Sequence, residues 1–187
     1  MLIKGSKRYN LRHNSKNVPP PDFGKMINGQ GMGNTANFRY GICPMSFNGC
    51  EVIAVHNALV WLGIPKPLSD VAFFMERYRV LMGFFGCNAY QLGKGLEHFG
   101  AAYCRTDKVS EAEASKAFII TFWTKKPFLS YIHTVFCVNR SNGIEVYNRY
   151  NNRNCTYICK NIEEIAGKRR PIAIYIIRDT EKKEEII

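Results

Sequence analysis

The stretch from 46 to 63, SFNGCEVIAVHNALVWLG, decides where the centre of this 187-residue chain lies. Apolar residues recur in it at helical spacing over most of the helix circumference, which predicts a helix buried in the middle of a domain. Asn48-Gly49 supplies a turn before the helix, and Gly63 with the prolines after it supplies an end. The sequence therefore predicts that Cys50 opens a central helix.

A cysteine in this position has two interpretations. The positive end of a helix dipole stabilises a thiolate and lowers the pKa of the thiol, which is how a nucleophilic cysteine is activated. Most free cysteines, however, are small buried hydrophobic residues, and this chain contains seven cysteines. The choice depends on whether a base and an orienting group occur elsewhere in the chain, because a cysteine nucleophile needs both.

His133 and Asn148 fit these two roles. Two β-rich segments, 133–138 and 144–148, flank the sequence NRSNG, which is typical of a hairpin. His133 opens the first strand and Asn148 closes the second, so the two side chains are expected side by side at one end of a sheet. Taken alone, His133 is compatible with an ordinary sheet histidine and Asn148 with a turn asparagine. Their occurrence together with Cys50 favours a catalytic site.

The order of the remaining patterns predicts an α+β domain, with helices first and an antiparallel sheet afterwards. Helices are expected from an N-cap at Ser69, from a cap at Asn88, and from a capping box formed by Ser110 and Glu113. Further strands are expected at 117–123, 127–132 and 172–177, with a short helix at about 161–167.

Three parts of the chain differ in composition. Residues 1–39 form a basic arm that we expect to be extended, with a polyproline-like segment at 17–24. Its glycine-rich stretch at 29–34 follows no strand, which argues against a phosphate loop. Residues 40–178 form the catalytic domain, and 179–187 form a charged tail.

The formal net charge of +11 allows an acidic partner for the arm. Nucleic acid is an unlikely partner because no nucleic-acid-binding motif accompanies the charge. No apolar run resembles a signal peptide or a membrane span, so the expected location is the cytoplasm and no membrane partner is predicted. The odd number of cysteines favours thiols, and four scattered histidines leave too few ligands for a zinc site. We therefore expect no metal and no cofactor.

Three short motifs together resemble the papain-like cysteine peptidases. They are Asn48-Gly49-Cys50 at the start of an apolar helix, His133-Thr134-Val135 on a strand, and Val146-Tyr147-Asn148 on the next strand. Across residues 40–152 the chain is most similar to the bacterial families related to bacteriocin-processing peptidases. The resemblance implies a papain-like fold, with Cys50 as nucleophile, His133 as general base and acid, and Asn148 as the residue that orients His133.

The chain departs from this family in two places. Glu51 follows the cysteine where the bacteriocin-processing relatives usually have glycine, and Pro44 lies where papain-like enzymes place an oxyanion-binding glutamine. Gln30, Asn48 or the backbone N–H of Cys50 are the remaining candidates for oxyanion donors. The sequence predicts a hydrolase of peptide or other amide bonds. An acyltransferase, an inactive papain-like binding module, and an interaction protein that docks through its arm remain as alternatives.

Overall fold

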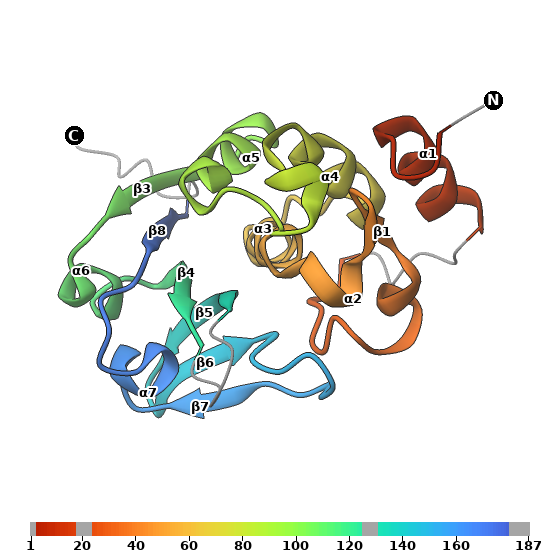
Figure 1. Cartoon of the computed structure of the whole chain (residues 1–187). Coiled ribbons are helices and arrows are strands. Elements are labelled where there is room, and N and C mark those ends of the chain that lie inside the picture. The colour runs from red at the N-terminus through yellow and green to blue at the C-terminus, as the bar shows by residue number, and fades with distance from the viewer. Residues whose placement is uncertain (1–2, 18–23, 125–130, 180–187) are drawn as a thin grey trace, which may run out of the picture.

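The computed structural model describes residues 3–17, 24–124 and 131–179, and it has an α+β architecture (Figure 1). Six antiparallel strands form one sheet in the order β3-β8-β4-β5-β6-β7. These strands are β3 (Ala102–Thr106), β4 (Ala117–Trp123), β5 (Ile132–Arg140), β6 (Gly143–Tyr147), β7 (Tyr157–Cys159) and β8 (Ala173–Arg178). A separate pair consists of β1 (Arg39–Tyr40) and β2 (Cys43–Pro44). The α+β expectation is confirmed, although β3, β7 and the β1–β2 pair were not anticipated.

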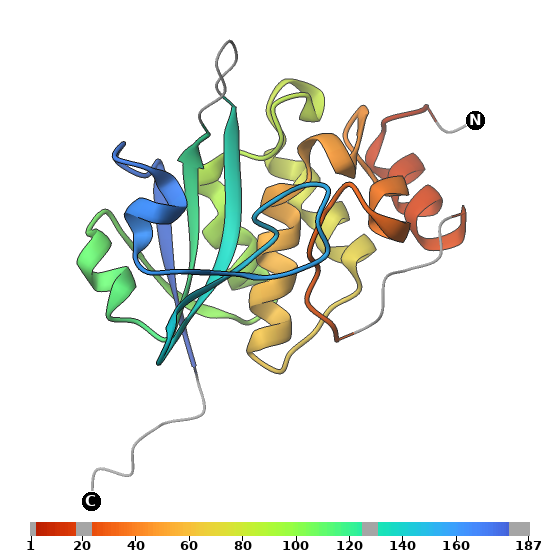
Figure 2. The ribbon, with the colours of Figure 1, turned by 90° about the horizontal axis from the view of Figure 1, so that it is seen from below.

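The part of the chain that the structure describes contains seven α-helices. They are α1 (Lys7–Arg12), α2 (Met45–Asn48), α3 (Cys50–Trp61), α4 (Leu68–Met75), α5 (Leu92–His98), α6 (Val109–Glu113) and α7 (Ile162–Ala166). Helix α3 begins at Cys50, as predicted, and Gly63 follows its end with a φ of 73°. Figure 2 shows α3 lying beside the long strands of the sheet.

The sheet separates two apolar clusters because successive side chains of a strand point to opposite faces. In β4, Ala117 and Ile119 belong to one cluster together with α3, α4 and α5, whereas Phe118 and Ile120 belong to the other with α6 and α7. All residues of α3 from Cys50 to Leu59 are buried. The helix that carries Cys50 is thus fixed on all sides.

Some predicted helix caps are present and others are not. Asn88 is a cap as predicted and accepts a hydrogen bond from the Tyr90 amide. The short helix expected at about 161–167 is present as α7, where Asn161 accepts from the Glu164 amide. Ser69 is not an N-cap, since α4 starts one residue earlier after Pro67. The capping box is also wrong, because Glu113 accepts from the distant Ile162 amide instead of reaching back toward Ser110.

The expectation of an extended arm is wrong for residues 7–17. They form α1 and one π-helical turn (His13–Asn17), and α1 packs against α4. Asn10 is buried there and donates hydrogen bonds to the Gly41 carbonyl and to Glu76. Most of the polyproline-like segment, residues 18–23, and the tail from 180 lie outside the described residues, as do residues 127–130 of the expected strand at 127–132.

Candidate active site

Cys50 lies at the start of α3, against the first residues of β5. Its side chain is buried, and its Sγ donates a hydrogen bond to Oε2 of Glu51 at 3.3 Å. The amide and the hydroxyl of Thr134 also interact with the sulfur, in the direction that favours the thiolate. The thiol is therefore close both to a carboxylate of its own helix and to the start of β5.

Burial raises the pKa of the Cys50 thiol well above its ordinary value, because a buried thiolate loses its hydration. The neighbouring charge of Glu51 raises it further, and the hydrogen bonds from Thr134 act in the opposite direction. In this state Cys50 is a protonated thiol at neutral pH. The expected stabilisation of a thiolate by the helix dipole is outweighed.

His133 is buried beside Phe122, whose ring it meets edge-on at a centroid distance of 6.0 Å. Its Nε2 lies 2.8 Å from the backbone carbonyl oxygen of Asn148. A carbonyl only accepts, so Nε2 carries the proton and the neutral imidazole keeps a lone pair on Nδ1. Burial lowers the pKa of His133 to about 4, and the charge of Arg149 contributes in the same direction. The imidazole is therefore neutral at neutral pH.

Asn148 orients His133 through its main chain and not through its side chain. Strand β6 ends at Tyr147, which pairs with Phe136, so the hairpin ladder stops short of His133. Asn148 then adopts a φ of 58°, in the left-handed region that asparagine tolerates better than most residues. The chain leaves the sheet there, and the carbonyl of Asn148 is the group that reaches His133.

The side chain of Asn148 pairs with Gln30. Its Nδ2 donates to Oε1 of Gln30 at 2.9 Å, and its Oδ1 accepts from the Gln30 amide at 3.0 Å. Gln30 in turn donates from Nε2 to the carbonyls of Met45 and Ser46, both at 3.3 Å, just before Cys50. Gln30 is thus bound both to the residue that orients His133 and to the segment that leads into α3.

Two glycines allow this contact between segments far apart in the sequence. A Cβ on Gly31 would lie 2.8 Å from the side-chain oxygen of Asn151, and one on Gly29 would lie 2.8 Å from the carbonyl oxygen of Arg153. The Gly31 amide donates to the Asn151 carbonyl at 2.8 Å. Figure 2 shows the loop after β6, in blue, crossing α3 to meet the red-orange segment that contains these glycines. The glycine-rich stretch serves this close backbone packing.

Asn48, the other predicted oxyanion donor, is directed elsewhere. Its Nδ2 donates to the carbonyls of Tyr40, at 3.0 Å, and of Gly83. These bonds tie the end of α2 to the segment 81–86. In this arrangement the donor hydrogens of Asn48 are used within the fold.

Glu51 is the residue of the site that sequence reasoning did not assign a role. It is 3 % exposed, and Gly86 packs so closely that a Cβ there would lie 2.9 Å from Oε2. The carboxylate accepts from its own amide and from the amide of Cys87. Burial raises the pKa of Glu51 to about 7. The signal in the sequence was the presence of a charged residue directly after the cysteine of an apolar helix, where the bacteriocin-processing peptidases usually have glycine.

These contacts connect several segments around Cys50 but do not bring His133 to the sulfur. Thr134 of β5 interacts with the sulfur, whereas the preceding residue, His133, points to the opposite face of the sheet and meets Phe122 of the other apolar cluster. His133 meets Asn148, Asn148 meets Gln30, and Gln30 meets the segment before Cys50. No hydrogen bond joins Cys50 to His133 directly in the parts of the chain that the structure describes. Of the predicted site residues, the structure connects His133, Asn148 and Gln30 to the segment before Cys50. It directs Asn48 elsewhere and leaves the side chains of Cys50 and His133 on opposite faces of the sheet.

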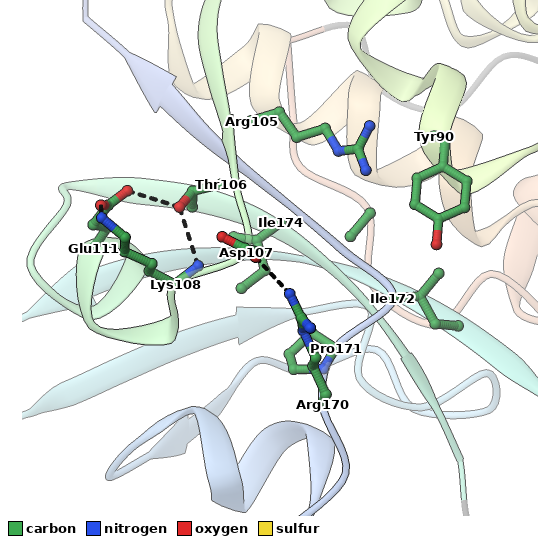
Figure 3. Close-up of a pocket in the computed structure, with 11 residues that line it drawn as sticks. Tyr90, Arg105, Thr106, Asp107, Lys108, Glu111, Arg170, Pro171, Ile172 and Ile174 are labelled. Atoms are coloured by element: carbon green, nitrogen blue, oxygen red, sulfur yellow. Dashed lines mark hydrogen bonds and ion pairs between the residues drawn. The ribbon is translucent and has the colours of Figure 1, made fainter.

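A separate cavity of about 900 Å³ lies where β3 ends and β8 begins (Figure 3). Its charges are largely paired, with Arg170 against Asp107 and Lys108 against Glu111. The guanidinium of Arg105 lies 4.6 Å from the centre of the Tyr90 ring. Neither Cys50 nor the residues connected to it line this cavity.

Comparisons with known proteins add no assignment: no protein-family model matches the chain, and no curated protein matches it in sequence. Within residues 3–17, 24–124 and 131–179, no helix is both long enough and apolar enough to span a membrane. All seven cysteines are free thiols.

Proposed function

We propose that this protein is a papain-like cysteine hydrolase that cleaves a peptide or another amide bond. The observation that carries the proposal is the set of hydrogen bonds that joins His133, Asn148 and Gln30 to the segment leading into Cys50. A helix that starts with the cysteine and packs on an antiparallel sheet suits the same class. The Nε2-protonated tautomer of His133 leaves Nδ1 free to accept a proton.

In the proposed mechanism, a local rearrangement of β5 first brings His133 to the sulfur; its Nδ1 then takes the thiol proton and the thiolate of Cys50 attacks the substrate carbonyl. The imidazolium then gives its proton to the leaving amine, and water hydrolyses the thioester. The Asn148 carbonyl stabilises the imidazolium by accepting from Nε2–H. The amide of Cys50 is the first of α3, where helix N–H groups lack intrahelical acceptors, and it is a suitable oxyanion donor. Nε2 of Gln30 can supply a second bond if it leaves its two long contacts at 3.3 Å.

One observation favours a second candidate, an inactive papain-like binding module. Cys50 donates a hydrogen bond to Glu51 and remains a protonated thiol in this state, so the resting site holds no thiolate–imidazolium pair. An enzyme of this kind must rearrange locally when substrate binds.

The two candidates are separated with an epoxysuccinyl-peptide, which alkylates cysteine nucleophiles that have a neighbouring histidine. We expect the probe to label Cys50 ahead of the six other cysteines, with loss of labelling in His133→Ala. His98→Ala is the matched control, because His98 is exposed and stacks on Phe74, away from Cys50. Peptide-mapping mass spectrometry identifies the labelled residue. Equal labelling of wild type and His133→Ala, or labelling of other cysteines first, contradicts the hydrolase and supports the binding module.

A further inference from the structure

Glu51 faces a small group of titratable side chains from several elements. Cys50 precedes it on α3, Cys87 follows the segment that covers it, and Tyr40 lies on β1. The carboxylate interacts electrostatically with all three. Tyr40 also senses Glu76, but its hydroxyl is bound to the Met75 carbonyl at 2.9 Å. Among these three groups, Cys50 is the one whose side chain donates a hydrogen bond to Glu51, and it is the proposed nucleophile.

We propose that Glu51 controls the protonation state of Cys50, and this role rests on the function proposed above. In the resting site its carboxylate accepts the S–H hydrogen bond and places a negative charge beside the sulfur, which disfavours the thiolate. Protonation of the carboxylate removes the negative charge and leaves a neutral, weaker acceptor beside the sulfur. The thiolate of Cys50 then forms more readily, and in the proposed mechanism its proton goes to His133.

The geometry supports this role because the carboxylate has little freedom to move away. Its contact with Gly86 and the N–H bond from Cys87 hold it on the sulfur side. Gly86 has a φ of 69°, a conformation that favours glycine, and a larger residue would collide with Oε2. The burial of Glu51 keeps its charge from being screened by water, and burial raises its pKa to about 7, so its charge changes near neutral pH.

The direct test is the pH profile of Cys50 alkylation by iodoacetamide in wild type and Glu51→Gln, followed by mass spectrometry of the Cys50 peptide. Removing the charge is expected to move the midpoint of the profile to lower pH. The rate at neutral pH then rises about tenfold or more, because it follows the thiolate fraction. An unchanged or slower rate in Glu51→Gln overturns the proposal, and a slower rate identifies Glu51 as a base instead.

Glu76→Gln is the matched control. Glu76 is equally buried, at 2 % exposure, but its partners are Asn10, the Gly41 amide and Arg79. This variant is expected to leave the Cys50 profile unchanged. If it shifts the profile as far as Glu51→Gln does, the effect belongs to buried carboxylates in general and the proposal fails.

A second measurement needs only the wild-type protein. If Glu51 ionises near pH 7 and thereby disfavours the thiolate, the logarithm of the alkylation rate rises with pH by less than one per unit between about pH 6 and 8. A slope of one throughout this range overturns the proposal. Both tests use a small alkylating agent and no substrate. The epoxysuccinyl-peptide can therefore fail to label Cys50, contradicting the hydrolase, while the control by Glu51 is still detected.

Discussion

The two sides of the Cys50 sulfur differ in what they do to its proton. On the side of Glu51, a buried carboxylate disfavours a negative charge on the sulfur. On the side of β5, the amide and hydroxyl of Thr134 favour the thiolate. The same sulfur thus has one neighbour that keeps it protonated and one that favours its ionisation.

The position of Cys50 at a helix N-terminus therefore does not by itself determine its reactivity. The helix dipole is worth about 1 kcal/mol or less at most sites. Complete burial and an adjacent carboxylate both act against the thiolate, and they raise the pKa of Cys50 despite the dipole. In this protein the balance between Glu51 and Thr134 sets how readily the Cys50 thiol ionises.

The largest expected difference, between Glu51 and His133, lies in how each makes the free energy of unfolding depend on pH. The pKa of Glu51 is raised from 4.5 to about 7, so the folded state binds more protons than the unfolded state in this range and stability falls as the pH rises through it. The pKa of His133 is lowered from 6.5 to about 4, so stability instead rises with pH between these values. The two contributions, each about 3 kcal/mol, oppose one another.

Urea unfolding at several pH values tests this opposition. Relative to wild type, the unfolding free energy of Glu51→Gln is expected to increase by about 3 kcal/mol between pH 4.5 and 7. That of His133→Asn is expected to decrease relative to wild type by a similar amount between pH 4 and 6.5. If both differences in unfolding free energy stay constant with pH, Glu51 and His133 do not have the shifted pKa values that their burial implies.

The next largest effect concerns the two hydrogen bonds between Asn148 and Gln30 and what they add to the free energy of unfolding. Asn148→Ala removes the two side-chain hydrogen bonds to Gln30 and leaves the carbonyl that binds His133 in place. Each buried hydrogen bond contributes about 1 kcal/mol, so a loss of about 2 kcal/mol is expected in urea unfolding at fixed pH.

Asn152→Ala is the control for that variant, since Asn152 is an exposed asparagine of the same loop and its replacement is expected to change stability by less than about 0.5 kcal/mol. Equal losses in the two variants would mean that the Gln30 contact adds nothing to stability.

Sequence patterns predicted the parts of this site that depend on local structure. The start of α3 at Cys50, strand β4 and the hairpin of β5 and β6 follow from periodicity and turn residues over short stretches. The pairing of Gln30 with Asn148 does not, because 118 positions separate the two residues. For Glu51, the sequence shows only that a glutamate replaces the glycine usual in the family that the chain resembles. A glutamate on a helix is usually exposed, and it is buried here because the sheet, the neighbouring helices and the segment before Cys87 enclose α3 completely.

The smallest expected effect isolates the contact between Thr134 and the sulfur. Thr134→Val keeps the shape of the side chain and removes the hydroxyl that hydrogen-bonds to Cys50, which should raise the pKa of the thiol. Alkylation of Cys50 at neutral pH is then expected to slow by a factor of about three to ten, at a cost of about 1 kcal/mol in stability. Thr121→Val is the matched control, because Thr121 is equally buried and shares a 3.0 Å hydroxyl contact with Thr134 on the neighbouring strand. Both variants break that contact, but only Thr134→Val removes the bond to the sulfur. Equal slowing in both variants would show that the threonine pair acts through the packing of β4 on β5. Thr134 would then have no direct effect on the pKa of the Cys50 thiol.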